Sequence, residues 1–280
     1  MRICLLTPTP DHPLLAATTA LLTPRHEVEW LDPAATDGFP DPGGLADVYL
    51  LKTRTPRALA LARFLEEHGA PVLNSAASTG LCQDRTVMAE VALRAGLPFV
   101  PTRTEPSLRR LEAAGEPAHP VVVKSRHSRR HDLVARVDDA ARLRELAERW
   151  PDEPVVVQPF TPNSGWDHKL WVIGDEIFAG LRRSELAVGG PDKRTRTLAP
   201  EELPAGWPEV VRRVGEVFAL DVYGVDLLDA GGGAPVIVDI NAFPGIRGQA
   251  GAPEALAALA LRTAAGGGRP RVPVGSSHGR

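Results

Sequence analysis

Short apolar runs separated by polar breaks follow one another through the first part of the chain, residues 1–82. Four of these runs have the length of a buried strand. One further stretch repeats its apolar residues at helical spacing and stops at Gly69. The expected strands cover residues 3–7, 28–31, 48–52 and 71–74, and the expected helix covers residues 57–68. Strands that alternate with helices predict a small parallel α/β domain.

The pattern changes to an α+β arrangement over residues 83–160. Asp84 precedes an apolar stripe at helical spacing that ends at Gly96, so we expect it to cap a helix. A second helix, capped by Asp138 or Asp139, should lie among apolar strands. The expected strands cover residues 120–124, 133–137 and 154–160.

Residues 161–265 are expected to form hairpins and helices around a long polar loop. The first hairpin turns at Gly174 and Asp175, a favourable pair for a two-residue turn. It should cover residues 168–181, followed by a loop over 182–208, a helix over 208–220, a second hairpin and an Ala-rich helix over 253–265. The helix over 208–220 should bury Val210, Val214, Val217 and Phe218. Residues 266–280 lack a packing pattern and are predicted to be a disordered tail.

Composition narrows the class of protein. The chain has 280 residues, of which 43% are hydrophobic, enough for a sizeable core. The net charge of -3 is too small to predict a nucleic acid or an acidic membrane as partner. Cys4 and Cys82 lie far apart, as free thiols of a reducing compartment do. No apolar run approaches the ~18 residues of a membrane span. A cytoplasmic protein that binds neither nucleic acid nor membrane is therefore expected.

The second hairpin carries the strongest chemical signal. An apolar strand delivers Asp239 and Asn241 to one face, because alternate strand residues share a face. The glycine-rich turn before it should fold it against the strand that carries Asp226. Carboxylate and carboxamide oxygens suit Mg²⁺, which takes few protein ligands and keeps water and phosphate oxygens. The alternative is a surface hairpin with solvated acids, but acids on an apolar strand need a cation to offset their desolvation.

The chain has neither the glycine-rich dinucleotide motif nor a phosphate-binding loop after its first strand. Lys124 instead ends a strand of three valines, where a desolvated ammonium would pair strongly with phosphate. Gln158 ends a similar strand that could offer backbone groups to an adenine edge. A basic loop, residues 125–132, lies between them and is predicted to be a mobile clamp over an anionic phosphate or substrate. Its cationic residues are Arg126, His127, Arg129, Arg130 and His131.

Taken in order, these motifs resemble the ATP-grasp superfamily over nearly the whole chain. They are Asp84-Arg85, Lys124, Gln158, Asp167-His168-Lys169, Asp226, Asp239-Ile240-Asn241 and Phe243-Pro244-Gly245. The resemblance implies an N-terminal α/β domain on the substrate side (1–82) and a central subdomain (83–160). It also implies a C-terminal subdomain with the metal site (161–265) before the tail (266–280). ATP would lie between the two subdomains.

The resemblance also implies roles for single residues. Arg85, Lys124 and Gln158 would bind ATP, with Arg85 standing where the family usually has a lysine. Asp226, Asp239 and Asn241 would hold Mg²⁺, with two ions expected. Lys169, Arg182 and Arg183 would form the catalytic route to the second substrate. From the charge of the basic loop itself, and not from the resemblance, Arg126, His127, Arg129 and Arg130 are expected to contact that substrate together with Gly245.

Two branches of the superfamily fit the motifs. Bacterial peptide and glutamate ligases are similar in size, in Asp167-His168-Lys169 and in the ending at Gly245. Inositol trisphosphate/tetrakisphosphate kinases are similar at Arg85, at Gln158 and over 239–245. The basic loop departs from both, since a ligase usually has glycines there, and it suggests an anionic substrate.

A carboxylate–amine ligase that forms an acyl phosphate is the favoured function. No cluster looks like a dedicated general base, and an ionised carboxylate needs none to accept a phosphoryl group, whereas a hydroxyl must lose a proton. A kinase of a small polyanion is the alternative, and a nucleotide-binding regulator without activity is a third. The substrate would be a small molecule or peptide, and the sequence leaves a homo-oligomer open.

Overall fold

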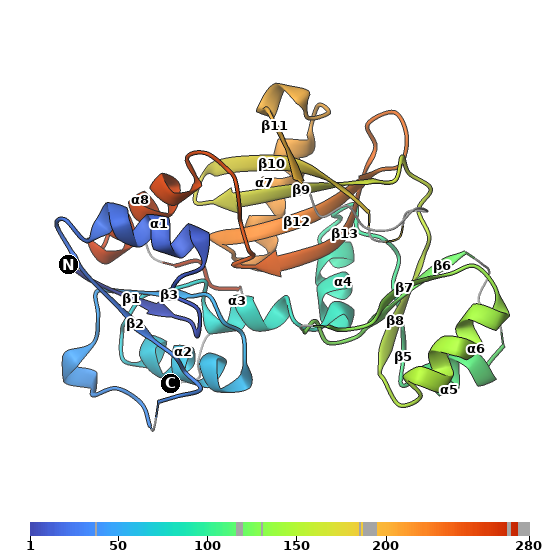
Figure 1. Cartoon of the computed structure of the whole chain (residues 1–280), viewed down its shortest axis with the longest axis horizontal. Coiled ribbons are helices and arrows are strands. Elements are labelled where there is room, and N and C mark those ends of the chain that lie inside the picture. The colour runs from blue at the N-terminus through green and yellow to red at the C-terminus, as the bar shows by residue number, and fades with distance from the viewer. Residues whose placement is uncertain are drawn as a thin grey trace.

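Three sheets in a row form the framework of the molecule (Figure 1). The computed structural model describes residues 1–36, 38–115, 120–129, 131–184, 186, 195–267 and 270–273. The N-terminal sheet has four strands, the largest sheet has five, and the third has four. Figure 1 shows the five-stranded sheet between the other two.

The N-terminal sheet is parallel, as the alternating pattern predicted. Its order is β2-β1-β3-β4, with β1 Arg2–Leu6, β2 Glu27–Leu31, β3 Val48–Leu51 and β4 Val72–Leu73. The helices of this part are α1 Pro13–Leu22, α2 Pro56–Glu67 and α3 Ala76–Leu81, with a short 3-10 turn at Pro42–Gly44. Helix α1 was not expected from the sequence, because the helix starts among prolines. Pro13 is nonetheless the first helical residue, where proline is well tolerated.

The third sheet is antiparallel and carries helices on one side. Its order is β5-β8-β6-β7, with β5 Arg103–Glu105, β6 Val121–Ser125, β7 Val134–Val137 and β8 Val155–Pro159. The helices are α5 Leu108–Ala113 and α6 Ala140–Arg149. Asp139 caps α6 by accepting a hydrogen bond from the backbone of Arg142. The strands predicted at 120–124, 133–137 and 154–160 are confirmed, while β5 and α5 were not foreseen.

The five-stranded sheet carries the acidic hairpin. Its order is β11-β10-β9-β12-β13, with β9 Trp166–Ile173, β10 Glu176–Arg183, β11 Thr195–Leu198, β12 Val222–Asp229 and β13 Pro235–Ala242. The prediction of a loop over 182–208 is wrong at both ends. β10 runs on to Arg183, and Thr195–Leu198 pairs with it as an edge strand before a 3-10 turn at Pro200–Glu202. β-branched threonines at alternate positions suit such an edge.

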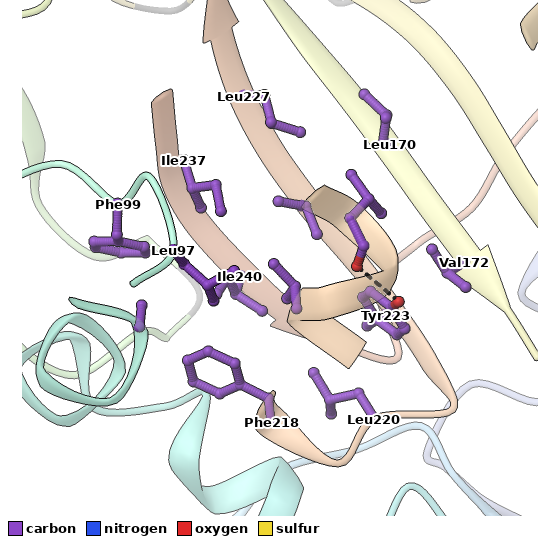
Figure 2. Packing of buried hydrophobic residues seen from close by; sticks show 14 of the residues in the cluster. Leu97, Phe99, Leu170, Val172, Phe218, Leu220, Tyr223, Leu227, Ile237 and Ile240 are labelled. Carbon is purple, nitrogen blue, oxygen red and sulfur yellow. Dashed lines mark hydrogen bonds between the residues drawn. The ribbon is translucent and has the colours of Figure 1, made fainter. Parts of the chain in front are cut away.

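The main hydrophobic core lies between this sheet and two helices, α4 Arg85–Arg94 and α7 Trp207–Phe218 (Figure 2). Val211, Val214 and Phe218 of α7 are fully buried, and the Tyr223 hydroxyl donates to the Val211 carbonyl at 3.0 Å. Of the four residues predicted to face inward, Val214 and Phe218 are confirmed as buried. Val210 and Val217 lie at the margin, because Trp207 begins the helix and rotates the buried stripe towards Val211.

The N-terminal sheet and the five-stranded sheet are joined by buried polar contacts. Asn74 is fully buried; it donates to the Val222 carbonyl and accepts from the amides of Asp221 and Val222. Helix α8, Ala252–Ala264, packs with α1 and the N-terminal strands in one hydrophobic cluster. The domain boundaries from the sequence stay a prediction, but this packing crosses the boundary at 82.

The chain ends are described in part. In the predicted tail, the Arg271 amide donates to the Asp221 carboxylate at 3.0 Å, and residues 268, 269 and 274–280 lie outside the described residues. Among the residues that the structure describes, no helix combines the length and apolar character needed to cross a membrane.

Candidate functional site

The acidic hairpin places its oxygen ligands as the strand pattern predicted. Asp226 of β12 pairs directly with Asp239 of β13, and Asn241 follows two residues later on the same face. The register shifts between Asp226 and Leu227, a bulge of the kind that often re-aims side chains at functional sites. The side chains of Asp226 and Asp239 are 22% and 16% exposed, so both carboxylates still reach open space.

Buried cations compensate these carboxylates. Lys169 Nζ lies 2.5 Å from Asp226 Oδ2, and Arg85 Nη2 lies 3.4 Å from Asp239 Oδ2. Burial disfavours the charged form of Lys169, but the Asp226 carboxylate outweighs burial and raises the pKa of Lys169. Burial likewise opposes ionisation of Asp239, yet Arg85 and the two nearby lysines hold its pKa below the ordinary value of 3.8. Both groups are therefore charged at neutral pH.

Lys124 is a further buried cation of the site. It is 7% exposed at the end of β6, and its Nζ donates to the Val238 carbonyl at 2.8 Å, across from the third sheet to β13. Burial lowers the pKa of the Lys124 ammonium, and Asp239 offsets this only in part. A positive charge held in such a dry wall interacts strongly with a phosphate group that replaces water beside it.

These residues line one cavity of about 200 Å³ between the third sheet and the five-stranded sheet. Its wall contains seven predicted site residues, Arg85, Lys124, Gln158, Lys169, Arg182, Asp226 and Asp239. Apolar walls come from Val100, Val122, Phe160 and Val238. Gln158 is 2% exposed and donates to the Thr102 hydroxyl at 3.1 Å. A wall that combines charged groups with apolar side chains suits a nucleotide, whose phosphates would lie towards the acidic hairpin.

A second hollow adjoins the first on the side of the N-terminal domain. It shares Lys169, Arg182 and Asp226 with the first cavity. Asn241 and Gly245, predicted for the metal and the second substrate, line this hollow. The shared residues therefore stand at the junction where two bound molecules would meet.

Several residues of the cavity were not predicted as site residues. Asn163 lies before β9, Ser184 lies just after β10, and Asp167 faces the same space. Burial raises the pKa of Asp167, with Lys169 opposing the shift. Ser184 could have been found from the sequence, since it lies two residues after Arg182 and strand alternation puts both on one face.

Strand alternation also separates Arg182 from Arg183, which were predicted to act together. Arg182 lines both hollows. Arg183 is the next residue of β10 and pairs in register with Trp166, so its side chain leaves on the opposite face of the sheet. The expectation that both arginines line one route is wrong for this geometric reason.

The described cations of the basic loop do not line the cavity. Arg126 forms a two-pronged hydrogen bond with Asp84, the nearest contact being 2.7 Å, and Arg129 pairs with Glu153 at 2.7 Å. His127 is exposed and bridges to Asp84 through its backbone, while Arg130 lies outside the described residues. The sequence predicted that these cations would clamp an anion, but in the described part of the loop acids of neighbouring segments already neutralise Arg126 and Arg129.

The oxygen groups fit a magnesium ion. Asp226, Asp239 and Asn241 provide hard ligands at the end of one hairpin, with open space beside them. In the described ranges no group of three or more His, Cys, Asp or Glu forms a closed metal cage. That combination suits Mg²⁺, which typically binds one or two carboxylates and completes its shell with water and substrate phosphates.

Comparison with known proteins identifies the family. The model of the RimK-like ATP-grasp domain matches residues 109–254, more than half of the chain's 280 residues. The protein therefore belongs to the RimK-like ATP-grasp family. Over 125 residues it is 31% identical to a ribosomal protein bS6–L-glutamate ligase of Escherichia coli. That match covers 41% of this chain and only 39% of the relative.

Solved structures agree on the fold. A RimK domain ATP-grasp protein from Sphaerobacter thermophilus superposes with a TM-score of 0.74 at 25% identity, covering 93% of this chain and 100% of that one. D-alanine–D-alanine ligase from Bacillus anthracis superposes with a TM-score of 0.70 at 15% identity, covering 96% and 100%. The ATP-grasp fold predicted from the motifs is confirmed. Of the two branches that the sequence resembled, the ligase branch is favoured.

Proposed function

We propose that this protein is an ATP-dependent carboxylate–amine ligase. The observation that supports it most is the junction of the two hollows, where Lys169, Arg182 and Asp226 belong to both walls. One hollow suits a nucleotide, and the other opens to the N-terminal domain, where a second molecule can approach the γ-phosphate. The matching relatives are named ligases, which agrees with this arrangement.

The reaction would proceed in two balanced steps. The substrate carboxylate attacks the γ-phosphorus of ATP, the bond to the β-phosphate oxygen breaks, and ADP leaves. An amine then attacks the carbonyl carbon of the acyl phosphate, phosphate leaves, and the nitrogen loses a proton. Mg²⁺ bound with ATP would neutralise phosphate charge, held by Asp226, Asp239 and Asn241. Two ions remain the expected number.

The protein's own groups would stabilise the transferring charge. Lys124 and Arg85 lie beside Asp239 at the nucleotide end, and Lys169 and Arg182 lie at the junction. Fixed cations in a site of restricted water access stabilise developing negative charge far better than they would in water. Asp167 lines the same cavity, and burial raises its pKa, the direction expected of a carboxylate that accepts the amine proton.

Replacing Lys124 with Met should weaken binding of a fluorescent ATP analogue by roughly 10- to 100-fold, the usual loss for one charge-assisted hydrogen bond. Methionine has similar length and no desolvation cost, so the fold should persist. Arg126→Gln is the matched comparison, since Arg126 faces Asp84 rather than the cavity, and its affinity should stay within about twofold. Fluorescence titration measures both. Equal losses of affinity in the two variants would contradict the assignment of Lys124 and would indicate that the nucleotide binds at the basic loop.

Hydroxylamine trapping tests the reaction itself. With ATP, Mg²⁺ and a panel of amino acids, dipeptides and other small carboxylic acids, an acyl phosphate should be intercepted as a hydroxamate, with ADP and free phosphate formed in equal amounts. The same panel should include inositol phosphates. A product that carries stable phosphate, with ADP but no free phosphate, would show a kinase instead.

The expectations from the sequence about the substrate, the compartment and the oligomeric state are also part of this proposal. The substrate would be anionic, either a small molecule or a peptide, and the protein would act in the cytoplasm, alone or as a homo-oligomer.

A further inference from the structure

The N-terminal sheet has a topological switch point that faces the second hollow. The strand order is β2-β1-β3-β4. From β1 the chain therefore continues outward to β2 at one edge of the sheet, and from β3 it continues outward to β4 at the other edge. The carboxyl ends of neighbouring strands whose connections diverge leave a crevice, where α/β domains bind ligands. His12 lies in the segment after β1, and Lys52 directly follows β3. Helix α2 begins at Pro56 just beyond, with the positive end of its dipole towards the same crevice.

Positive groups converge on this crevice from two parts of the fold. Lys52 and Arg54 come from the N-terminal domain, and Arg247 comes from the segment after the metal hairpin. Lys52 Nζ donates to the Phe243 carbonyl at 3.0 Å and lies 5.7 Å from the centre of the Phe243 ring. No carboxylate forms an ion pair with Lys52, Arg54 or Arg247 in the part of the chain that the structure describes. Their charges therefore lack the compensation that the basic loop has.

The uncompensated charge affects the protonation of the cluster. Burial lowers the pKa of Lys52 to about 8, and repulsion from Arg54 and Arg247 adds to the shift. Burial and the same positive neighbours, Lys52 and Arg247, lower the pKa of His12 to about 4, although exposed Asp11 opposes the effect. The Nδ1 atom of His12 is buried and has no hydrogen-bond partner. An anion in the crevice would satisfy these groups together.

The crevice is continuous with the reaction site. The Nε2 atom of His12 lies 3.4 Å from the place where a Cβ on Gly245 would be, and Gly245 and Arg247 line the second hollow with Lys169. A molecule that fills this hollow would contact Lys169 and Arg247, and at Gly245 it would lie next to His12.

We propose that Lys52, Arg54 and Arg247, with His12, form a subsite for an anionic group of the ligase substrate, a carboxylate or a phosphate. This group is distinct from the carboxylate that receives the γ-phosphoryl group. The inference rests on the proposed ligase function and narrows its substrate class to acids with at least two anionic groups. Lys52 and its neighbours would fix one anionic group and so position the other.

Binding of simple probes tests the subsite without ATP. Glutarate and inorganic phosphate are titrated at constant ionic strength against chloride, and the dissociation constant is obtained from the concentration dependence of the melting temperature. At least one probe should stabilise the wild-type protein at pH 7. Lys52→Met and Arg247→Gln should each bind it about tenfold more weakly or worse, the usual cost of losing one charged contact. A response to glutarate assigns a carboxylate, and a response to phosphate assigns a phosphate.

Two controls place the binding. Arg25→Gln removes an exposed arginine before β2, at the opposite end of the sheet, and should keep the wild-type response. Lys124→Met, altered in the nucleotide cavity, shows whether a probe binds in that cavity instead. The affinity for glutarate should also fall as the pH rises through about 8 in wild type, and at a higher pH in Arg247→Gln, where loss of the repulsion raises the pKa of Lys52. This fall should be absent in Lys52→Met.

The result would overturn the subsite if neither probe stabilised the wild-type protein, or if Lys52→Met responded as wild type does. Loss of the response in Lys124→Met alone would show that the probe binds in the nucleotide cavity, which would also reject the proposed subsite. None of these measurements needs turnover. Probe binding without any hydroxamate would therefore reject the ligase reaction and keep the anion subsite.

Discussion

Asp239→Asn should lower Mg²⁺-dependent ATP turnover by about a thousandfold, comparable to removing a group that stabilises transition-state charge directly. The change keeps the side-chain volume and removes one ligand charge. Asp239 is ionised at neutral pH, because nearby cations lower its pKa below the ordinary 3.8. The Asp239 carboxylate is therefore available to a metal ion at pH 7. Release of ADP at increasing Mg²⁺ concentration measures the effect, and added Mg²⁺ should not restore the rate.

Asp132→Asn is the matched control for this variant. Asp132 also pairs with Arg85, at 2.6 Å, but does not line the nucleotide cavity. Both variants remove a carboxylate from the same arginine, so both should lose some stability. Only Asp239→Asn should lose the turnover, while Asp132→Asn should stay within about tenfold of wild type. Turnover by Asp239→Asn at the wild-type rate would remove Asp239 from the metal site.

Trp207→Ala should lower the free energy of unfolding by about 3–5 kcal/mol, the range for removing a large aromatic side chain from a core. Trp207 is fully buried at the start of α7. Its indole nitrogen donates to the Gly233 carbonyl at 2.8 Å, which ties α7 to the turn of the metal hairpin. The His168 ring packs edge-on against it with centroids 4.7 Å apart. The alanine variant would leave a cavity and an unpaired carbonyl.

Trp30→Ala provides the comparison, since Trp30 is 57% exposed on β2. Its substitution should change stability by less than about 1 kcal/mol. Urea unfolding followed by circular dichroism gives both values under identical conditions. Similar midpoints for the two variants would contradict the role assigned to Trp207.

The strands that form the hairpins were predictable because local information specifies them. Gly174 and Asp175 fix the turn between β9 and β10, and the glycine-rich segment after Asp229 fixes the turn between β12 and β13. Once a turn is fixed, register and alternation follow, which is why Asp226 was correctly expected opposite Asp239. Helix α1 and strand β11 were both missed, for different reasons. Prolines obscure the start of helix α1. Strand β11 is a short edge strand that depends on β10 for its pairing.

Roles that depend on the partner of a charge were harder to predict. Arg126 and Lys52 are both cations close to a strand end, and the sequence favoured the arginine because it stands among other basic residues. The structure favours Lys52 over Arg126 as the cation that could bind an anion. Asp84 and Glu153 neutralise Arg126 and Arg129 from distant segments, whereas in the described structure the charged neighbours of the Lys52 ammonium are Arg54 and Arg247. Charge compensation is a property of the tertiary structure, since its partners lie far apart in the chain.

The sequence by itself determined the succession of elements, the acidic hairpin with its candidate magnesium ligands, and the membership of the ATP-grasp fold. These features rest on periodicity, turn chemistry and short motifs, which act over a few residues. The tertiary structure alone decided which cations face the cavity, that Arg182 and Arg183 leave on opposite faces, and that His12, Lys52 and Arg247 meet. The physical reason is that packing of separate segments sets burial and charge neighbours. Those two quantities decide whether a side chain binds a ligand or another part of the protein.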